Sequence, residues 1–211
     1  MRSYRTATFA ANAIHETGLE RRAANFRPLT PLTFLDRAAA TYPSRIAVRH
    51  GELGLDYATL RTRCHRLAAG LATLGVAPGD TVAVMAPNVP ALLEAHYGVP
   101  LAGAVLNALN TRLDARTIAF ILAHGEARVL LTDTEFAPVI REAMALLDRP
   151  LTVVDIVDDP AAGDRLGALD YEELLARGAD DFVPYVPADE WQAIALNYTS
   201  GTPAIRSASS T

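Results

Sequence analysis

A short run of hydroxyl residues around a glycine lies near the C-terminus, directly after an apolar segment. The run is Thr199-Ser200-Gly201-Thr202, and the preceding residues 191–197 are typical of a β-strand. Glycine lets the backbone approach an anion closely, so that N–H groups and hydroxyls can bind phosphate oxygens. A loop of this type after a strand is a usual phosphate position in an α/β sheet. We therefore take these four residues as the candidate phosphate site, although Ser-Gly and Thr-Pro are also ordinary turn dipeptides.

Other residues that could do chemistry favour structural roles. Cys64 falls on the apolar stripe of a predicted helix, where we expect a buried, unreactive thiol. Asp155, Asp158 and Asp159 are interpreted as solvated acids of a loop. The histidines share no metal-ligand spacing with a Cys, Asp or Glu partner, and we expect ordinary surface or half-buried side chains. These histidines are His15, His50, His65, His96 and His124. The sequence therefore predicts no metal site.

The elements that must position the loop alternate between short apolar runs and helical patterns. Glycines at Gly51 and Gly54 are expected to separate the first strand from the helix that follows it, and Asp114 is expected to cap a later helix. Strands are predicted at 46–48, 81–85, 103–106, 128–131, 151–154 and 191–197. Helices are predicted at 31–42, 57–74, after residue 88, and at 114–124, 135–147 and 171–176. This alternation predicts an α/β fold built from parallel βαβ units.

Composition excludes several classes of function. Half of the 211 residues are hydrophobic, which is enough to bury a core, and the net charge of -5 gives no reason to expect a nucleic-acid partner. The single cysteine rules out an intramolecular disulfide, and no apolar run reaches the eighteen residues of a membrane span. Residues 1–17 lack the apolar centre of a secretory signal, and we expect a flexible N-terminus and a cytoplasmic protein.

Several segments together resemble a known family. The segments 56–60, 79–83, 94–113 and 195–202 are similar to those of the adenylate-forming synthetases, which comprise acyl-CoA synthetases, luciferases and peptide-synthetase adenylation domains. The segment 94–113 most resembles the short- and medium-chain acyl-CoA ligases, including plant acyl-activating enzymes. The last segment matches the start of the family's phosphate loop, Y-T-S-G-T-T-G-x-P-K-G.

The resemblance implies a fold and a reaction. The fold would be the N-terminal βαβ portion of the acyl-CoA synthetase large domain, an incomplete parallel sheet flanked by helices. A carboxylic acid would be activated with ATP to an acyl-adenylate, and coenzyme A would then displace AMP to give the thioester. ATP, Mg²⁺ and coenzyme A are the implied cofactors and small-molecule partners. Thr199, Ser200, Gly201 and Thr202 are the only ligands of the ATP phosphates that carry over, and no catalytic residue or metal ligand does.

The similarity stops after Thr202. The family continues T-G-x-P-K-G, whereas this chain has Pro203, Ala204 and an unrelated tail. We interpret 18–202 as a partial AMP-dependent synthetase domain and 203–211 as an aberrant tail that a one-nucleotide frameshift would explain. The expected outcome is a truncated, inactive remnant that binds the cofactors poorly, if at all. Two alternatives are a non-catalytic binding or interaction module and a fragment of an adenylating enzyme whose acceptor is not coenzyme A.

Overall fold

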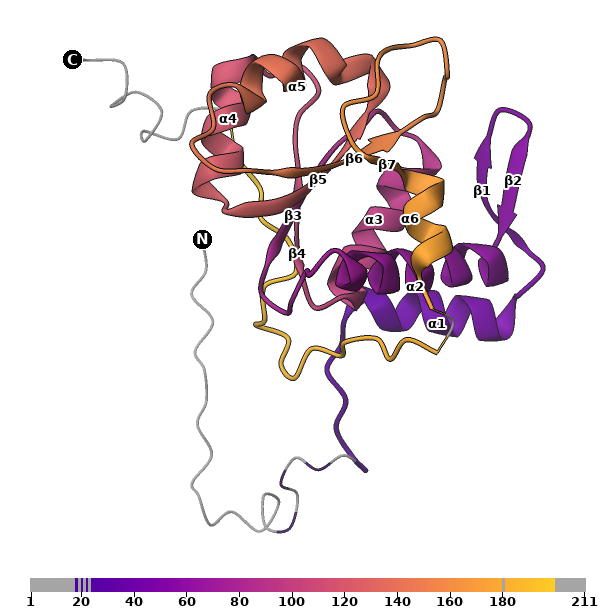
Figure 1. Cartoon of the computed structure of the whole chain (residues 1–211). Coiled ribbons are helices and arrows are strands. Elements are labelled where there is room, and N and C mark those ends of the chain that lie inside the picture. The colour runs from indigo at the N-terminus through magenta and orange to yellow at the C-terminus, as the bar shows by residue number, and fades with distance from the viewer. Residues whose placement is uncertain (1–17, 19, 21, 23, 180, 200–211) are drawn as a thin grey trace, which may run out of the picture.

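A parallel sheet lies at the centre of the molecule. The computed structural model describes residues 18, 20, 22, 24–179 and 181–199, and Figure 1 shows their arrangement. Among these residues the sheet has the strand order β4-β3-β5-β6-β7, and each neighbouring pair is parallel. The strands are β3 (Thr81–Met85), β4 (Val105–Ala108), β5 (Ala127–Asp133), β6 (Thr152–Ile156) and β7 (Leu169–Asp170). The parallel α/β architecture predicted from the alternation is confirmed.

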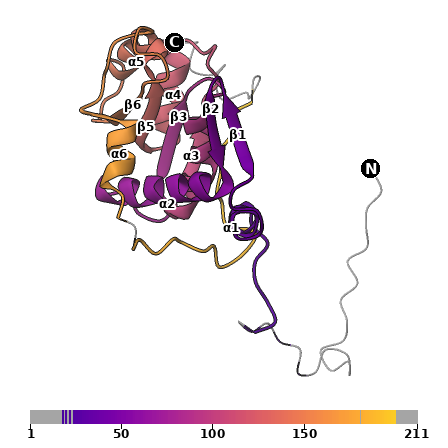
Figure 2. The ribbon, with the colours of Figure 1, turned by 90° about the vertical axis from the view of Figure 1, so that its right-hand side faces the viewer.

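Helices cover both faces of this sheet, as a parallel sheet requires. One face packs against α2 (Tyr57–Thr73), α3 (Pro90–Leu101) and α6 (Tyr171–Arg177). The opposite face packs against α4 (Ala115–His124) and α5 (Ala137–Met144). Figures 1 and 2 show the two helical layers on either side of the strands.

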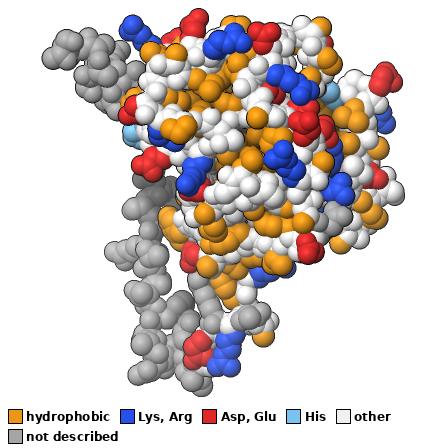
Figure 3. All heavy atoms as spheres, in the orientation of Figure 1, with side chains coloured by type: hydrophobic (Ala, Val, Ile, Leu, Met, Phe, Trp, Pro, Cys, Tyr) orange, Lys and Arg blue, Asp and Glu red, His pale blue; other side chains and the backbone are white. Residues whose placement is uncertain are grey.

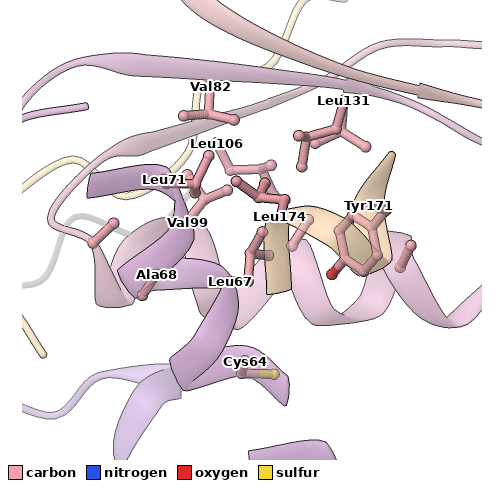
Figure 4. Close-up of a cluster of buried hydrophobic side chains, with 14 of the residues drawn as sticks. Cys64, Leu67, Ala68, Leu71, Val82, Val99, Leu106, Leu131, Tyr171 and Leu174 are labelled. Atoms are coloured by element: carbon pink, nitrogen blue, oxygen red, sulfur yellow. The ribbon is translucent and has the colours of Figure 1, made fainter. Parts of the chain in front are cut away.

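Successive residues of the central strand β3 serve the two layers in turn. Val82 and Val84 belong to the core under α2, α3 and α6, whereas Ala83 and Met85 belong to the core under α4 and α5. This alternation follows from the two-residue period of a strand. Figure 4 shows the first core, in which side chains of α2, α3 and α6 meet those of the strands. The labelled helical side chains include Leu67, Leu71, Val99 and Leu174, and the labelled strand side chains are Val82, Leu106 and Leu131.

Aspartate side chains fix the starts of several helices. Asp114 accepts a hydrogen bond from the Thr117 N–H at 3.0 Å, which confirms the predicted start of α4. Asp170 accepts from the Glu173 N–H at 2.8 Å, and the Glu173 carboxylate accepts from the Asp170 N–H at 2.8 Å. This reciprocal pair is a capping box, and it explains why the short helix α6 begins at Tyr171.

A hairpin and one further helix lie outside the central sheet. Helix α1 (Pro31–Thr41) packs against α2 and α3. It leads into the antiparallel strands β1 (Ile46–His50) and β2 (Leu53–Asp56), which stand apart from the main sheet in Figure 1. Gly51 has a φ of 54° and makes the turn. The expectation that Gly54 is also a turn residue is wrong, because Gly54 lies within β2 and pairs with Arg49.

Two predicted elements differ from the observed ones. The helix predicted over 135–147 is a 3-10 turn at Thr134–Phe136 followed by α5. The strand predicted over 191–197 is reduced, within the described residues, to one isolated bridge between Leu106 of β4 and Ala195. A strand assignment needs a continuing ladder of backbone bonds, which an apolar segment does not by itself provide.

Candidate functional site

The segment that precedes the hydroxyl-rich run lies along the outer edge of β4. The Leu106 N–H donates to the Ile194 carbonyl at 3.0 Å, and the Leu196 N–H donates to the Leu106 carbonyl at 2.8 Å. The segment is parallel to β4, and Ala195 lies opposite Leu106. In this register Thr199 falls beyond Ala108, the last residue of β4. Ligands of open α/β sheets bind outside the carboxyl ends of the strands, so the chain enters the predicted loop at a suitable place.

Tyr198 attaches the end of this segment to α4. Its hydroxyl lies 2.7 Å from Nδ1 of His124. The two rings meet edge to face with their centroids 5.8 Å apart, and Phe120 stacks on the imidazole at 5.4 Å. Burial raises the pKa of the Tyr198 phenol, so its hydroxyl keeps its proton at neutral pH. His124 was expected to be an ordinary surface or half-buried histidine, and this contact was not predicted from the sequence.

The four predicted phosphate ligands are only partly visible. Thr199 is exposed at the end of the described segment. Ser200, Gly201 and Thr202 lie outside the described residues, as do residues 203–211 and the predicted flexible residues 1–17. The assignment of these four residues to a phosphate site therefore stays a prediction.

A buried charged network joins three helices away from the loop. The Glu94 carboxylate on α3 is fully buried and accepts from the Arg63 Nε at 2.6 Å and from the Tyr171 hydroxyl at 2.8 Å. The Arg63 guanidinium also donates to the exposed Glu172 carboxylate at 2.6 and 2.9 Å. Burial raises the pKa of Glu94, and the hydrogen bonds from Arg63 and Tyr171 oppose that shift. The network links α2, α3 and α6, and a single acid within the apolar stretch 89–102 was the available sequence signal.

The other candidate residues have structural roles, and one prediction about them is wrong. Asp155 was expected to be a solvated loop acid, but it is fully buried in β6 and accepts from the N–H groups of Leu166 and Gly167 at 3.0 and 2.9 Å. Asp158 pairs with His50 at 3.0 Å. Cys64 is buried in the first core, and burial raises the pKa of its thiol, as expected for an unreactive cysteine. The described ranges contain no group of three or more His, Cys, Asp or Glu side chains suited to hold a metal ion.

An apolar groove of about 560 Å³ lies between the hairpin, α3 and the edge segment. Leu92, Tyr97 and Ile194 are among the residues that line it. Its His50 side chain is already paired with Asp158. The groove therefore offers apolar surface next to the edge segment without a convergent set of polar groups. On the face shown in Figure 3, acidic and basic side chains are interspersed.

The fold and the edge segment can now be compared with known proteins. The profile of the AMP-binding enzyme family matches residues 35–204. The chain belongs to this family. The match includes the parallel sheet, both helical layers and the four predicted phosphate ligands.

Relatives in the family are CoA ligases. The chain is 46% identical to the peroxisomal acetate/butyrate–CoA ligase AAE7 of Arabidopsis thaliana over 195 residues, which cover 86% of this chain and 34% of the relative. It is 44% identical to the acetate–CoA ligase CCL3 of Humulus lupulus, covering 88% of this chain and 35% of that protein. The chain thus spans about a third of the length of these relatives.

Solved structures agree on the fold. The Mycobacterium tuberculosis fatty acyl CoA synthetase superimposes with a TM-score of 0.65 at 30% identity, covering 81% of this chain and 32% of that one. The anthranilate CoA ligase AuaEII in complex with anthranoyl-AMP gives a TM-score of 0.72 at 20% identity, covering 86% and 34% of the two chains. This second likeness concerns the fold alone. Among the described residues, no helix has both the length and the apolar character needed to cross a membrane.

Proposed function

We propose that this chain carries the first part of an ATP-dependent acid–CoA ligase that acts on a short-chain carboxylic acid. The observation that carries the proposal is the 46% identity to an acetate/butyrate–CoA ligase over 86% of the chain, within a family match over residues 35–204. In this reaction the carboxylate oxygen attacks the α-phosphate of ATP and pyrophosphate leaves. The coenzyme A sulfur then attacks the acyl carbon, and AMP leaves. A carboxylate is a poor electrophile until its oxygen is joined to such a leaving group.

We propose further that residues 18–202 form part of the synthetase domain, and that Thr199, Ser200, Gly201 and Thr202 bind the ATP phosphates. The position of Thr199 beyond the end of β4 supports this assignment. Backbone N–H groups and small hydroxyls would hold the β- and γ-phosphates, so the contribution of this segment would be positioning. The described residues supply no ligand set for Mg²⁺, and we assign no step to a metal.

The chain alone is proposed to be inactive. It spans about a third of the length of the related ligases. The chain contains 19 arginines and no lysine. The loop lysine that the resemblance implies is therefore absent, and with it one cation that would stabilise the charge on the reacting phosphates. A non-catalytic binding module and an adenylating fragment with another acceptor are the competing proposals. The cytoplasm stays our proposed compartment, although the AAE7 relative is named as peroxisomal.

Pyrophosphate exchange tests these proposals. We expect no exchange of labelled pyrophosphate into ATP by the 211-residue chain with acetate or butyrate. A second protein, expressed after one base is restored beside the codon of Thr202, is the matched comparison. Acid-dependent exchange by this second protein supports a frameshift in a ligase gene, and thioester formation with coenzyme A excludes another acceptor. Exchange by the 211-residue chain itself would refute the proposed inactivity.

A further inference from the structure

Two different attachments hold the end of the edge segment. The first is the pair of backbone bonds between Leu106 of β4 and residues 194 and 196. The second is the side-chain contact of Tyr198 with His124, two residues further along the chain. The first attachment fixes the direction of the segment beside β4. The second lies at Tyr198, the last residue before the predicted phosphate loop.

His124 is suited to this attachment because its ring contacts two aromatic side chains. It is the last residue of α4, and Phe120 lies one helical turn earlier on the same helix. Phe120 stacks on the imidazole with a centroid distance of 5.4 Å and an interplanar angle of 25°. The edge of Tyr198 contacts the same imidazole at 5.8 Å and 80°. An imidazole that contacts two aromatic rings loses less freedom when its nitrogen makes a hydrogen bond than an uncontacted one would.

The hydrogen bond lies at the surface, between the exposed His124 and the half-buried Tyr198. Nδ1 of one imidazole tautomer accepts from the Tyr198 hydroxyl, and Nδ1–H of the other donates to it. The distance of 2.7 Å is typical of a strong hydrogen bond to a hydroxyl. Tyr198 also packs against the core under α4 and α5, so its ring is anchored independently of its hydroxyl.

We propose that His124 is a positioning residue that acts through Tyr198 to fix the start of the loop at Thr199. The role assigned to the loop rests on the proposed function, whereas the anchor rests on the geometry of His124, Tyr198 and Phe120. An experiment can therefore refute the anchor without refuting the role of the loop, or refute the role of the loop without refuting the anchor.

Hydrogen exchange of the full 211-residue chain tests the anchor. Tyr198→Phe and His124→Phe keep the rings and remove the bond, and each should raise the exchange rate of the Thr199 amide roughly fivefold, the effect of one ordinary hydrogen bond. The double variant should exchange no faster than either single variant, because both remove the same bond. His124→Asn should restore much of the protection, because its amide can reach the position of Nδ1.

Tyr185→Phe is the matched control. It removes a phenol hydroxyl that bonds to Gln192, near the beginning of the same segment, at 3.2 Å. This change should raise amide exchange only near residue 192 and leave the exchange rate of the Thr199 amide unchanged. Single variants that change Thr199 exchange by less than about twofold, or a double variant that shows additive effects, would overturn the anchor.

Titration with ATP separates the anchor from the proposed function. If the unmodified chain binds ATP, Tyr198→Phe and His124→Phe should weaken binding by a similar, roughly fivefold factor and His124→Asn should recover it. Unchanged affinity in both Phe variants would overturn the positioning role. If the unmodified chain does not bind ATP, the phosphate site proposed for this chain fails, and the exchange rates alone decide whether the anchor exists.

Discussion

Replacing Arg63 by Met tests what the buried network contributes to stability. The methionine keeps the apolar stem of the arginine and removes the guanidinium that bonds to Glu94 at 2.6 Å. Glu94 has no exposed surface, so the variant leaves a buried carboxylate without its cation. The Tyr171 hydroxyl, at 2.8 Å, remains as a donor to that carboxylate.

The expected loss is about 3 kcal/mol in the free energy of unfolding at neutral pH. Removing one partner of a buried ion pair costs roughly 3–5 kcal/mol because the remaining charge is uncompensated. The lower end applies here because Tyr171 still donates to Glu94 and because Arg63 keeps part of its side chain in solvent, 23% by area. Glu172 is exposed, and the loss of its contact with Arg63 adds little.

The loss should depend on pH with a definite sign. Burial already raises the pKa of Glu94 above its ordinary value of 4.5, and removing Arg63 removes a contact that lowers it. A carboxyl whose pKa is raised on folding favours the folded state at low pH, and this contribution disappears as pH rises through its folded pKa. Urea unfolding followed by circular dichroism should therefore show a smaller penalty for Arg63→Met at about pH 5 than at about pH 7.

The double variant Arg63→Met with Glu94→Gln is the control. The neutral glutamine still offers an oxygen to the Tyr171 hydroxyl, so the double variant should recover about 2 kcal/mol of the loss at neutral pH. Its own free energy of unfolding should carry no pH dependence from residue 94, because glutamine does not titrate. The reasoning is refuted if Arg63→Met costs less than about 1 kcal/mol at both pH values, or if the double variant is no more stable than the single one at neutral pH.

Three further predictions concern single residues. Gly70→Ala should lower the free energy of unfolding by about 1–3 kcal/mol in a urea titration, because the new Cβ would lie 2.5 Å from the Leu174 carbonyl oxygen; an unchanged midpoint would show that α6 shifts freely. Asp114→Ala should cost about 1 kcal/mol by the same measurement, since it removes the cap of α4, and Asp114→Asn should retain most of that stability. Cys64 should not react with a thiol reagent in the native chain and should react fully in urea; rapid labelling of folded protein would contradict its burial.

Much of the fold could be predicted from the sequence because local signals agree with it. The strands β3, β5 and β6 are buried on both faces, so their sequences are short apolar runs, as expected of strands in a covered parallel sheet. Asp114 identifies a helix start because its short side chain reaches the N–H of Thr117. Gly54 misled the prediction because a glycine favours turns but does not prevent pairing in a hairpin strand.

The buried polar contacts were harder to predict because they join residues that are distant in the sequence. Glu94, Arg63 and Tyr171 come from three helices, and only their packing brings them together. The environment of Asp155 was also not predictable from the residues next to it in the sequence. Its neighbours in the sequence suggest a solvated loop, but the chain folds back and places the N–H groups of Leu166 and Gly167 on its carboxylate.

The edge segment shows that alternating side-chain burial does not by itself establish a β-strand. Side chains at residues 192, 194, 196 and 198 are half-buried and those between them are exposed, as in a segment with one side toward the protein. Whether the segment is also a strand depends on how many bonds it makes with β4, and Leu106 provides the observed bridge. A segment held by so few backbone bonds needs another contact to fix its end, and the Tyr198 hydroxyl on His124 supplies one. The predicted phosphate loop is recognisable from its own residues, whereas Tyr198, just before it, contacts a histidine 74 residues earlier in the chain.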